Sequence, residues 1–301
     1  MIEVKHISKS YGETEALKDV SLKVQTGELF GLIGPDGAGK TTLMRILMTL
    51  LLPDKGEAEM MFHDVVQAHK IIRNIAGYMP GRFSLYQDLT VEENLAFFAT
   101  VFGTTIEENY DLIKDIYVQI EPFKTRRAGK LSGGMKQKLA LSCALIHKPE
   151  VLILDEPTTG VDAVSRKEFW DMLKRLKALG ITILVSTPYM DEAEQCDRIA
   201  LIENGTILGT DTPSGLKLGF NGKLWQYSTQ KLYQSLKLIR EIEQVESVHT
   251  FGQFLHLTTA NDMTEESLEE VLKPQIQDAF TVKQMEPGIE DVFMQKMAEH
   301  E

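Results

Sequence analysis

Continuous apolar runs alternate with helical patterns along the first two thirds of this chain. Three runs stand out: LFGLIG (29–34), the start of VLILDEP (151–157) and ITILVST (181–187). A short continuous run of this kind is typical of a strand buried on both faces. Buried strands that alternate with helices predict a parallel sheet covered on both sides, so we expect an α/β fold.

Less regular patterns of apolar residues predict further strands and helices. DVSLKV (19–24) alternates as a half-buried strand does, and residues 82–148 repeat apolar positions at helical spacing. Asn204-Gly205 predicts a hairpin within 199–210.

A cluster of Pro and Gly at 212–223 marks a change of domain. The strand and helix patterns beyond it predict a small α+β domain, in which no catalytic group of residues is apparent. The expected domains are 1–211, with a helical subdomain at about 82–148, and 220–301.

Charge and composition argue against several classes of function. The net charge of −12 over 301 residues disfavours binding to nucleic acid. Two cysteines, Cys143 and Cys196, are too few for a disulfide framework and indicate a reducing compartment. The N-terminus lacks the apolar region of a secretory signal, and no apolar run approaches the roughly 20 residues that span a bilayer. We expect any membrane role to depend on a partner.

GPDGAGKT (34–41) matches the phosphate-binding pattern G-x-x-x-x-G-K-[ST] between a buried strand and a helix. Glycines let successive N–H groups point at phosphate oxygens, and the helix N-terminus adds partial positive charge. Lys40 would reach the β- and γ-phosphates and Thr41 would bind Mg²⁺. Asp36 would repel phosphate unless it points away, and we interpret Pro35-Asp36-Gly37 as a turn.

Two further motifs complete the set. VLILDEP ends in acids at the sheet edge where ligands bind, so Asp155 is expected to hold Mg²⁺ and Glu156 to polarise an attacking water. In LSGGMKQ (131–137), Ser132 can cap a helix whose first N–H groups lie on glycines, which gives a second anion site.

These motifs, in this order, resemble the ATP-binding subunit of ABC transporters over about residues 1–210. The resemblance implies a P-loop nucleoside triphosphatase core with an N-terminal antiparallel β part, and an ATPase that uses ATP and Mg²⁺. Its implied nucleotide-binding residues are Tyr11, Gly34, Pro35, Asp36, Gly37, Ala38, Gly39, Lys40, Thr41, Thr42, Leu131, Ser132, Gly133, Gly134 and Gln137. Tyr11 would stack on adenine; alternatively, it is a buried strand-end residue.

The resemblance also implies partners. These are a transmembrane permease, which residues from about 82 to 94 would face, and a second ATP-binding subunit. The chain would be cytoplasmic, held at the inner face of the cell membrane. GIEDVFM (288–294) is similar to the tail of exporters of drugs, lipids or polysaccharides. The C-terminal domain would serve dimerisation or regulation.

Two positions depart from the family pattern. Gly81 stands where the family has a glutamine at Mg²⁺, and Pro188 where it has a histidine at the γ-phosphate. Gln87 lies six residues too late to replace the first. Pro188 cannot donate a hydrogen bond. We therefore expect this chain's own site to be weak in hydrolysis, and an intact signature (Leu131–Gly134) to serve a competent site on a non-identical partner; a homodimer is the alternative.

Two other classes stay open. One is a soluble ABC protein that acts on ribosomes or DNA, against which stand the single cassette and the absence of heptad repeats. The other is a small-molecule P-loop kinase, which would leave LSGGMKQ unexplained.

Overall fold

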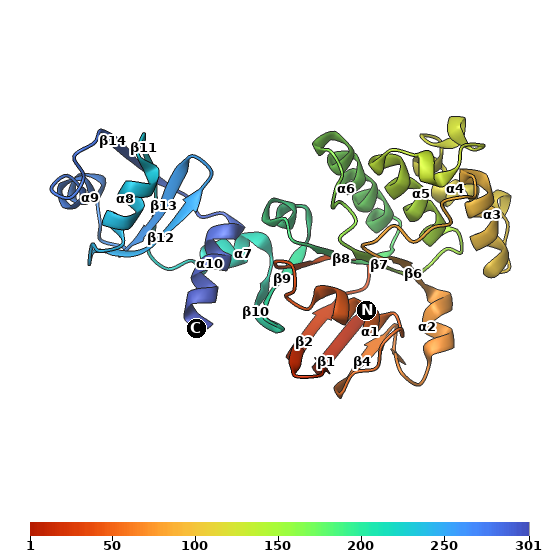
Figure 1. The fold of residues 1–301 in the computed structure, drawn as a ribbon. Coiled ribbons are helices and arrows are strands. Elements are labelled where there is room, and N and C mark those ends of the chain that lie inside the picture. The colour runs from red at the N-terminus through yellow and green to blue at the C-terminus, as the bar shows by residue number, and fades with distance from the viewer. Residues whose placement is uncertain (301) are drawn as a thin grey trace. The chain divides into compact units, whose positions relative to one another are not determined.

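A six-stranded sheet forms the centre of residues 1–213 in the computed structural model, which describes residues 1–300 (Figure 1). Its strands, in spatial order, are β10 (Thr206–Asp211), β9 (Arg198–Glu203), β3 (Leu29–Ile33), β8 (Thr182–Thr187), β7 (Val151–Asp155) and β6 (Ala76–Met79). All neighbours are parallel except β10, which pairs antiparallel with β9. Every residue of β3, β7 and β8 is buried, so the predicted α/β fold with a mostly parallel sheet is confirmed.

The predicted hairpin is also present. Asn204 and Gly205 join β9 to β10, and both have the positive φ that a two-residue hairpin turn requires, 47° and 78°.

An antiparallel sheet covers one side of this unit. Its order is β2 (Thr14–Val24), β1 (Ile2–Tyr11), β4 (Lys55–Met60) and β5 (His63–Asp64). Only the second half of β2 was predicted as a strand. β1 and β2 pair with several register shifts, and His6 and Asp19 have positive φ. Such bulges interrupt the two-residue alternation by which strands are recognised in a sequence.

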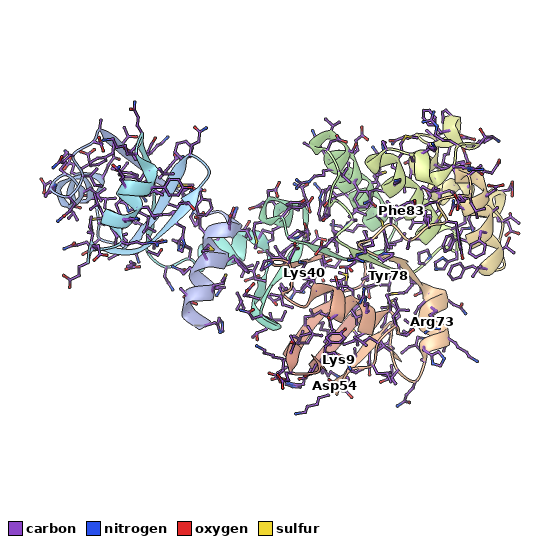
Figure 2. All side chains as sticks on the ribbon, in the orientation of Figure 1. Lys9, Lys40, Asp54, Arg73, Tyr78 and Phe83 are labelled. Atoms are coloured by element: carbon purple, nitrogen blue, oxygen red, sulfur yellow. The ribbon has the colours of Figure 1, made fainter. Side chains whose placement is uncertain are left out.

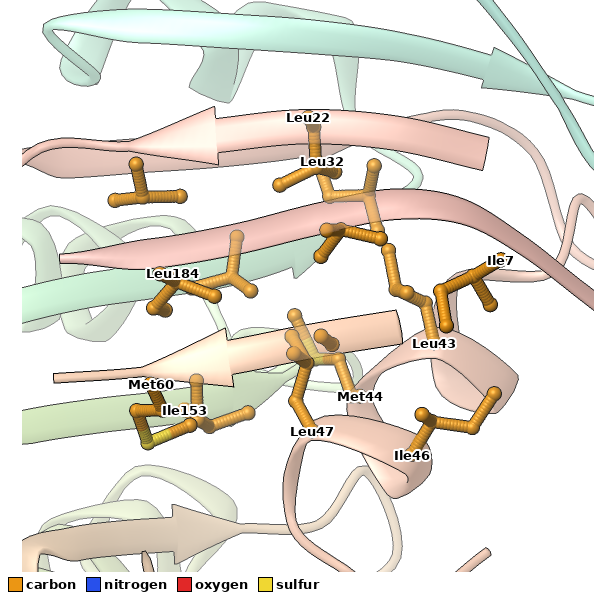
Figure 3. Packing of buried hydrophobic residues seen from close by; sticks show 14 of the residues in the cluster. Ile7, Leu22, Leu32, Leu43, Met44, Ile46, Leu47, Met60, Ile153 and Leu184 are labelled. Atoms are coloured by element: carbon orange, nitrogen blue, oxygen red, sulfur yellow. The ribbon is translucent and has the colours of Figure 1, made fainter. Parts of the chain in front are cut away.

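Helix α1 (Lys40–Leu47) packs between the two sheets. Leu43, Met44, Ile46 and Leu47 are fully buried in one cluster with residues of β1, β2, β3, β7 and β8, and Figure 3 shows this packing. The helix that begins at the phosphate-binding loop is therefore anchored on both sides, which fixes the position of the loop.

The other helices of this unit cover the opposite side of the central sheet or flank its edge (Figure 1). Thr90 and Thr105 open α3 and α4 with capping boxes. Within the predicted helical segment at about 82–148, residues 82–90 form no helix, and the first helix begins at Val91. The helices are α2 (His69–Ile75), α3 (Val91–Val101), α4 (Ile106–Tyr117), α5 (Gly133–Leu145) and α6 (Ala163–Ala178), with short η1 (Glu121–Phe123), η2 (Ala128–Lys130) and η3 (Met190–Gln195).

A second compact unit begins at Ser214, just after α7 has started (Pro213–Leu218). Its order is β11 (Lys223–Thr229), α8 (Leu232–Ile239), β12 (Val245–Phe251), β13 (Phe254–Thr259), α9 (Glu265–Leu272), β14 (Phe280–Met285) and α10 (Ile289–His300). The antiparallel sheet order β12-β13-β11-β14 is that of a split β-α-β unit. Its own core contains Trp225 and Tyr227 from the sheet and Leu268 and Leu272 from α9.

Within residues 1–300, none of the helices combines the length and the apolar character that crossing a bilayer requires.

Substitution of Leu43 tests the packing of α1. Leu43 is fully buried, so Leu43→Ala is expected to lower the free energy of unfolding by about 2–5 kcal/mol, measured by urea unfolding followed by circular dichroism. Leu52 is 64% exposed, and Leu52→Ala is expected to change it by less than about 0.5 kcal/mol. Equal losses in the two variants would contradict this description of the core.

Candidate functional site

Loop 34–39 connects β3 to α1, and its backbone is built on glycine. Gly37 and Gly39 have φ of 84° and 103°, values that favour glycine. A Cβ at Gly34 would lie 2.1 Å from the carbonyl oxygen of Ile202, and one at Gly39 would lie 2.4 Å from that of Ala16. Larger residues would therefore displace the loop from the strands behind it.

The loop also contains the predicted turn. The N–H of Ala38 donates to the carbonyl of Pro35 (3.3 Å), and Asp36 and Gly37 occupy the exposed centre of the turn. Asp36 therefore points to solvent. In the described residues no side chain caps α1 at Gly39, so the first N–H groups of this helix remain available to an anion.

The Lys40 side chain turns back onto this loop, and Figure 2 labels its position in the molecule. It is 3% exposed, and its Nζ donates to the carbonyls of Gly34 and Pro35, each at 2.8 Å. The same Nζ lies 3.1 Å from Oε1 of Glu156. A buried ammonium in contact with a carboxylate marks the centre of the site.

Asp155, at the end of β7, accepts hydrogen bonds from two hydroxyl groups. Thr41 Oγ1 donates to Asp155 Oδ1 at 3.1 Å, and Ser186 Oγ donates to the same oxygen at 2.8 Å. Ser186 was not singled out from the sequence, although as a polar residue at the end of a buried strand it shared the signal that identified Asp155.

Thr41 and Asp155 fit a magnesium site that a nucleotide completes. Mg²⁺ prefers oxygen ligands and usually keeps several waters and substrate phosphates, so one hydroxyl and one carboxylate suffice. Among residues 1–300 no group of three or more His, Cys, Asp or Glu side chains could hold a metal without such help.

Glu156 has an unusual backbone. Its φ is 48°, a value that is uncommon for a residue with a side chain. Its N–H donates to Ser186 at both Oγ (3.0 Å) and the carbonyl oxygen (3.1 Å), which holds this turn in place. The turn directs the carboxylate toward Lys40.

Gly81 and Pro188 lie at the same edge of the sheet. A Cβ at Gly81 would lie 3.1 Å from the carbonyl oxygen of Asp155 and 3.8 Å from its Oδ2, so this position faces the acid without offering a side chain. Gln87 lies beside Gly129. Pro188 directly follows Thr187, whose carbonyl accepts from the N–H of Gly34 (3.3 Å).

Tyr78, on β6, lies within range of the charge of Asp155. Burial, together with the charge of Asp155, raises the pKa of Tyr78 to about 12, so the phenol stays neutral at physiological pH.

The signature residues lie apart from the phosphate-binding loop, at the start of α5. Ser132 caps α5, as predicted, and accepts from the N–H of Met135 (3.4 Å). A Cβ at Gly134 would lie 2.7 Å from Ser165 Oγ, and one at Gly133 would lie 3.3 Å from the carbonyl oxygen of Gly160. The two glycines therefore pack on residues 160–165, which form the end of the loop after β7 and the start of α6.

The other residues predicted to bind nucleotide lie on α1, on β1 and at or near α5. Leu131 is buried, and Gln137 lies beside Gly134 on α5. Thr42 is in the first turn of α1. Tyr11 ends β1 and is 47% exposed, which excludes the alternative of a buried tyrosine.

The chain is similar in sequence to known proteins. Residues 17–159 match the ABC transporter family. The probable multidrug ABC transporter ATP-binding protein YbhF of Escherichia coli (strain K12) is 40% identical over 219 residues, which are 72% of this chain and 38% of that protein's length. The Nod factor export ATP-binding protein I of Rhizobium sp. (strain N33) is 34% identical over 302 residues, 97% of this chain and 95% of that protein.

Solved structures give the same result. One described as the ATP-binding subunit of an ABC transporter aligns with a TM-score of 0.67 and 30% identity, over 73% of this chain and 93% of the other. A dimeric ATP-binding cassette in a post-hydrolysis state, bound to ADP and Pi, aligns with a TM-score of 0.64 and 27% identity, over 70% of this chain and 98% of the other. The predicted resemblance is thus confirmed: the chain belongs to the ABC transporter family of ATP-binding proteins.

Proposed function

We propose that this chain is the ATP-hydrolysing subunit of an exporter, and that it acts on a separate transmembrane permease. The observation that carries this proposal is the convergence of Lys40, Thr41, Asp155 and Glu156 at one edge of the sheet. The names of the relatives, which concern multidrug transport and Nod factor export, support the exporter class.

ATP would bind with its phosphates on the loop. The N–H groups of Gly37 and of residues 39–42, together with the Lys40 ammonium, would supply positive charge around the phosphate oxygens. Thr41 and Asp155 would hold Mg²⁺, which offsets the charge of the phosphates. Tyr11 offers an exposed ring for stacking on adenine.

Glu156 is the residue suited to act on water. Its carboxylate accepts a proton while the water oxygen forms a bond to the γ-phosphorus and the bond to the bridging oxygen breaks. The hydrogen bonds from its N–H to Ser186 keep the carboxylate in place during this step.

Gly81 and Pro188 weaken this site. Neither provides a side-chain donor or acceptor, although Gly81 lies against Asp155 and Pro188 follows the end of β8, the strand next to β7. By analogy with deleted oxyanion donors, the loss of one positioned donor lowers the turnover rate by about 10²- to 10³-fold. ATP binding is retained, because the loop, Lys40 and Asp155 are intact.

The signature residues 131–134 are intact, which supports a dimer of this chain with a non-identical ATP-binding subunit. In this arrangement the chain holds ATP at its own loop and lends Ser132 and Gly134 to a competent site on a different ATP-binding subunit. A homodimer is the second arrangement, and a dimeric cassette among the related structures is compatible with both. The permease would place the pair at the inner face of the cell membrane, and the C-terminal unit would serve dimerisation or regulation.

Equilibrium binding of a fluorescent ATP analogue tests the site. The wild-type chain is expected to bind with micromolar affinity in the presence of Mg²⁺. Lys40→Ala is expected to weaken binding at least about tenfold, because a charge-assisted contact to phosphate is lost. Lys237→Ala, at an exposed lysine of α8, is the matched control and should leave the affinity unchanged. Equal affinity in all three proteins would contradict the assignment.

Pro188→His tests the weak site. A histidine at this position restores a donor, so the steady-state ATPase rate of the isolated chain should rise at least about tenfold. High turnover of the wild-type chain that does not respond to this substitution would disprove the weak-site hypothesis.

Ser132→Arg separates the two arrangements. In the complex that co-purifies with the chain, it should abolish ATP hydrolysis, whereas Lys40→Ala should retain a substantial part of the rate. Equal losses would indicate two equivalent sites and a homodimer.

A further inference from the structure

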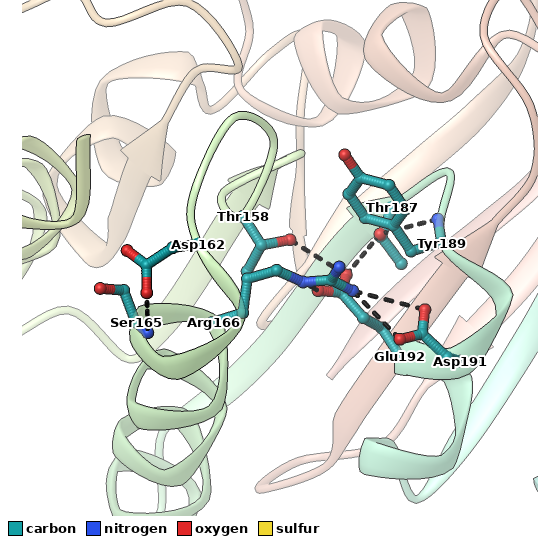
Figure 4. Close-up of polar contacts among 8 residues, drawn as sticks. All are labelled: Thr158, Asp162, Ser165, Arg166, Thr187, Tyr189, Asp191 and Glu192. Atoms are coloured by element: carbon teal, nitrogen blue, oxygen red, sulfur yellow. Dashed lines mark hydrogen bonds and ion pairs between the residues drawn. The ribbon is translucent and has the colours of Figure 1, made fainter.

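Glu192, in η3, is a buried carboxylate with bonds to three segments of the chain (Figure 4). The residue is 3% exposed. Its Oε2 accepts from the hydroxyls of Thr187 and of Thr158, the latter at 3.0 Å, and its Oε1 accepts from Nε of Arg166, also at 3.0 Å. A buried charge needs several such partners, so this one constrains all the segments that supply them.

Each partner belongs to a functional part of the chain. Thr158 lies two residues after Glu156, and Thr187 directly precedes Pro188. Arg166 lies in the first turns of α6. The segment 158–166, which leads from β7 into α6, is thus bound to Glu192 at both ends: Thr158 binds Oε2 and Arg166 binds Oε1.

The signature glycines rest on that same loop. Gly133 lies against the carbonyl of Gly160 and Gly134 against Ser165, which neighbours Arg166. The segment that Glu192 holds therefore has Glu156 at one end and the contact surface of the signature at the other.

The network also fixes the turn at Pro188. Proline restricts its own φ but has no N–H with which to anchor the turn. The anchor comes from Thr187, whose hydroxyl donates to Glu192 and accepts from the N–H of Tyr189 (3.1 Å). The guanidinium of Arg166 stacks over the Tyr189 ring at 4.3 Å and pairs with Asp191 at 3.2 Å, which completes the arrangement.

We propose that Glu192 is a positioning residue for ATP hydrolysis, which holds the Glu156 loop, the Pro188 turn and the support of the signature in one arrangement. The proposal rests on the function proposed above. Glu192 acts through its partners, since its own carboxylate is enclosed by Thr158, Thr187 and Arg166. A disturbed network displaces Glu156, whereas the phosphate-binding loop is also held from elsewhere, by the bond from the N–H of Gly205 to the carbonyl of Ala38 (3.1 Å) and by the packing of α1 in the core.

Threonine variants test this with minimal change of shape. Thr158→Val and Thr187→Val each remove one donor to Oε2, and Glu192→Gln removes the charge. Each is expected to lower kcat about tenfold while the Kd for MgATP stays within about twofold, because hydrogen bonds to a charged group are lost away from the phosphates. Thr158→Ser keeps the hydroxyl and should restore kcat. The double variant should lose less than the product of the single losses, since both donors share one oxygen.

Thr182→Val is the matched control. Thr182 is a fully buried threonine at the other end of β8, where its hydroxyl accepts from the N–H of Gly27 (3.0 Å). This substitution removes a comparable hydrogen bond and should leave kcat unchanged.

The outcomes separate the two proposals. Unchanged kcat in the Thr158 and Thr187 variants, or an equal loss in Thr182→Val, overturns the role of Glu192 and leaves the proposed function standing. Failure of the wild-type chain to bind MgATP, or of the complex that co-purifies with it to hydrolyse MgATP, overturns both. If Glu192→Gln does not fold, the threonine variants and the rescue by Thr158→Ser decide the question.

Discussion

The buried ammonium of Lys40 is the constraint on which the rest of the structure depends. A positive charge that is 3% exposed must be compensated, and the loop carbonyls and Glu156 do this at the edge of the sheet. The loop can curl around the ammonium only because glycines permit its backbone, and it stays in place because α1 is packed between two sheets. The core thus fixes where the charge lies, and the charge determines what can bind there.

Much of this was predictable from particular residues. Continuous apolar runs located β3, β7 and β8, because strands of a parallel sheet are buried on both faces. The spacing of Gly34, Gly39 and Lys40 indicated the phosphate-binding loop, since few other local structures need that pattern. Asn204-Gly205 specified a hairpin through its own backbone preference. In each case, neighbours along the chain carry the information.

Other parts depend on contacts between distant residues and left no local pattern. Bulges at His6 and Asp19 hide the alternation of β1 and β2. The partners of Glu192 come from three separate segments, and its burial is set by how η3 packs. An acidic residue in an acidic stretch such as MDEAEQ normally indicates a solvated helix face, and nothing in the sequence distinguishes the one side chain that is enclosed.

The position of Gly81 limits the side chains that can stand beside Asp155. A Cβ there would lie 3.1 Å from the carbonyl oxygen of Asp155, closer than ordinary van der Waals contact. A larger residue would fit there if the backbone at the end of β7 moved by a few tenths of an ångström, and that backbone is held by the bond from the N–H of Glu156 to Ser186. A side chain added at Gly81 alone would therefore press on the main chain that carries Asp155. Room for it would have to come from the end of β7, so the two strand ends constrain each other's residues.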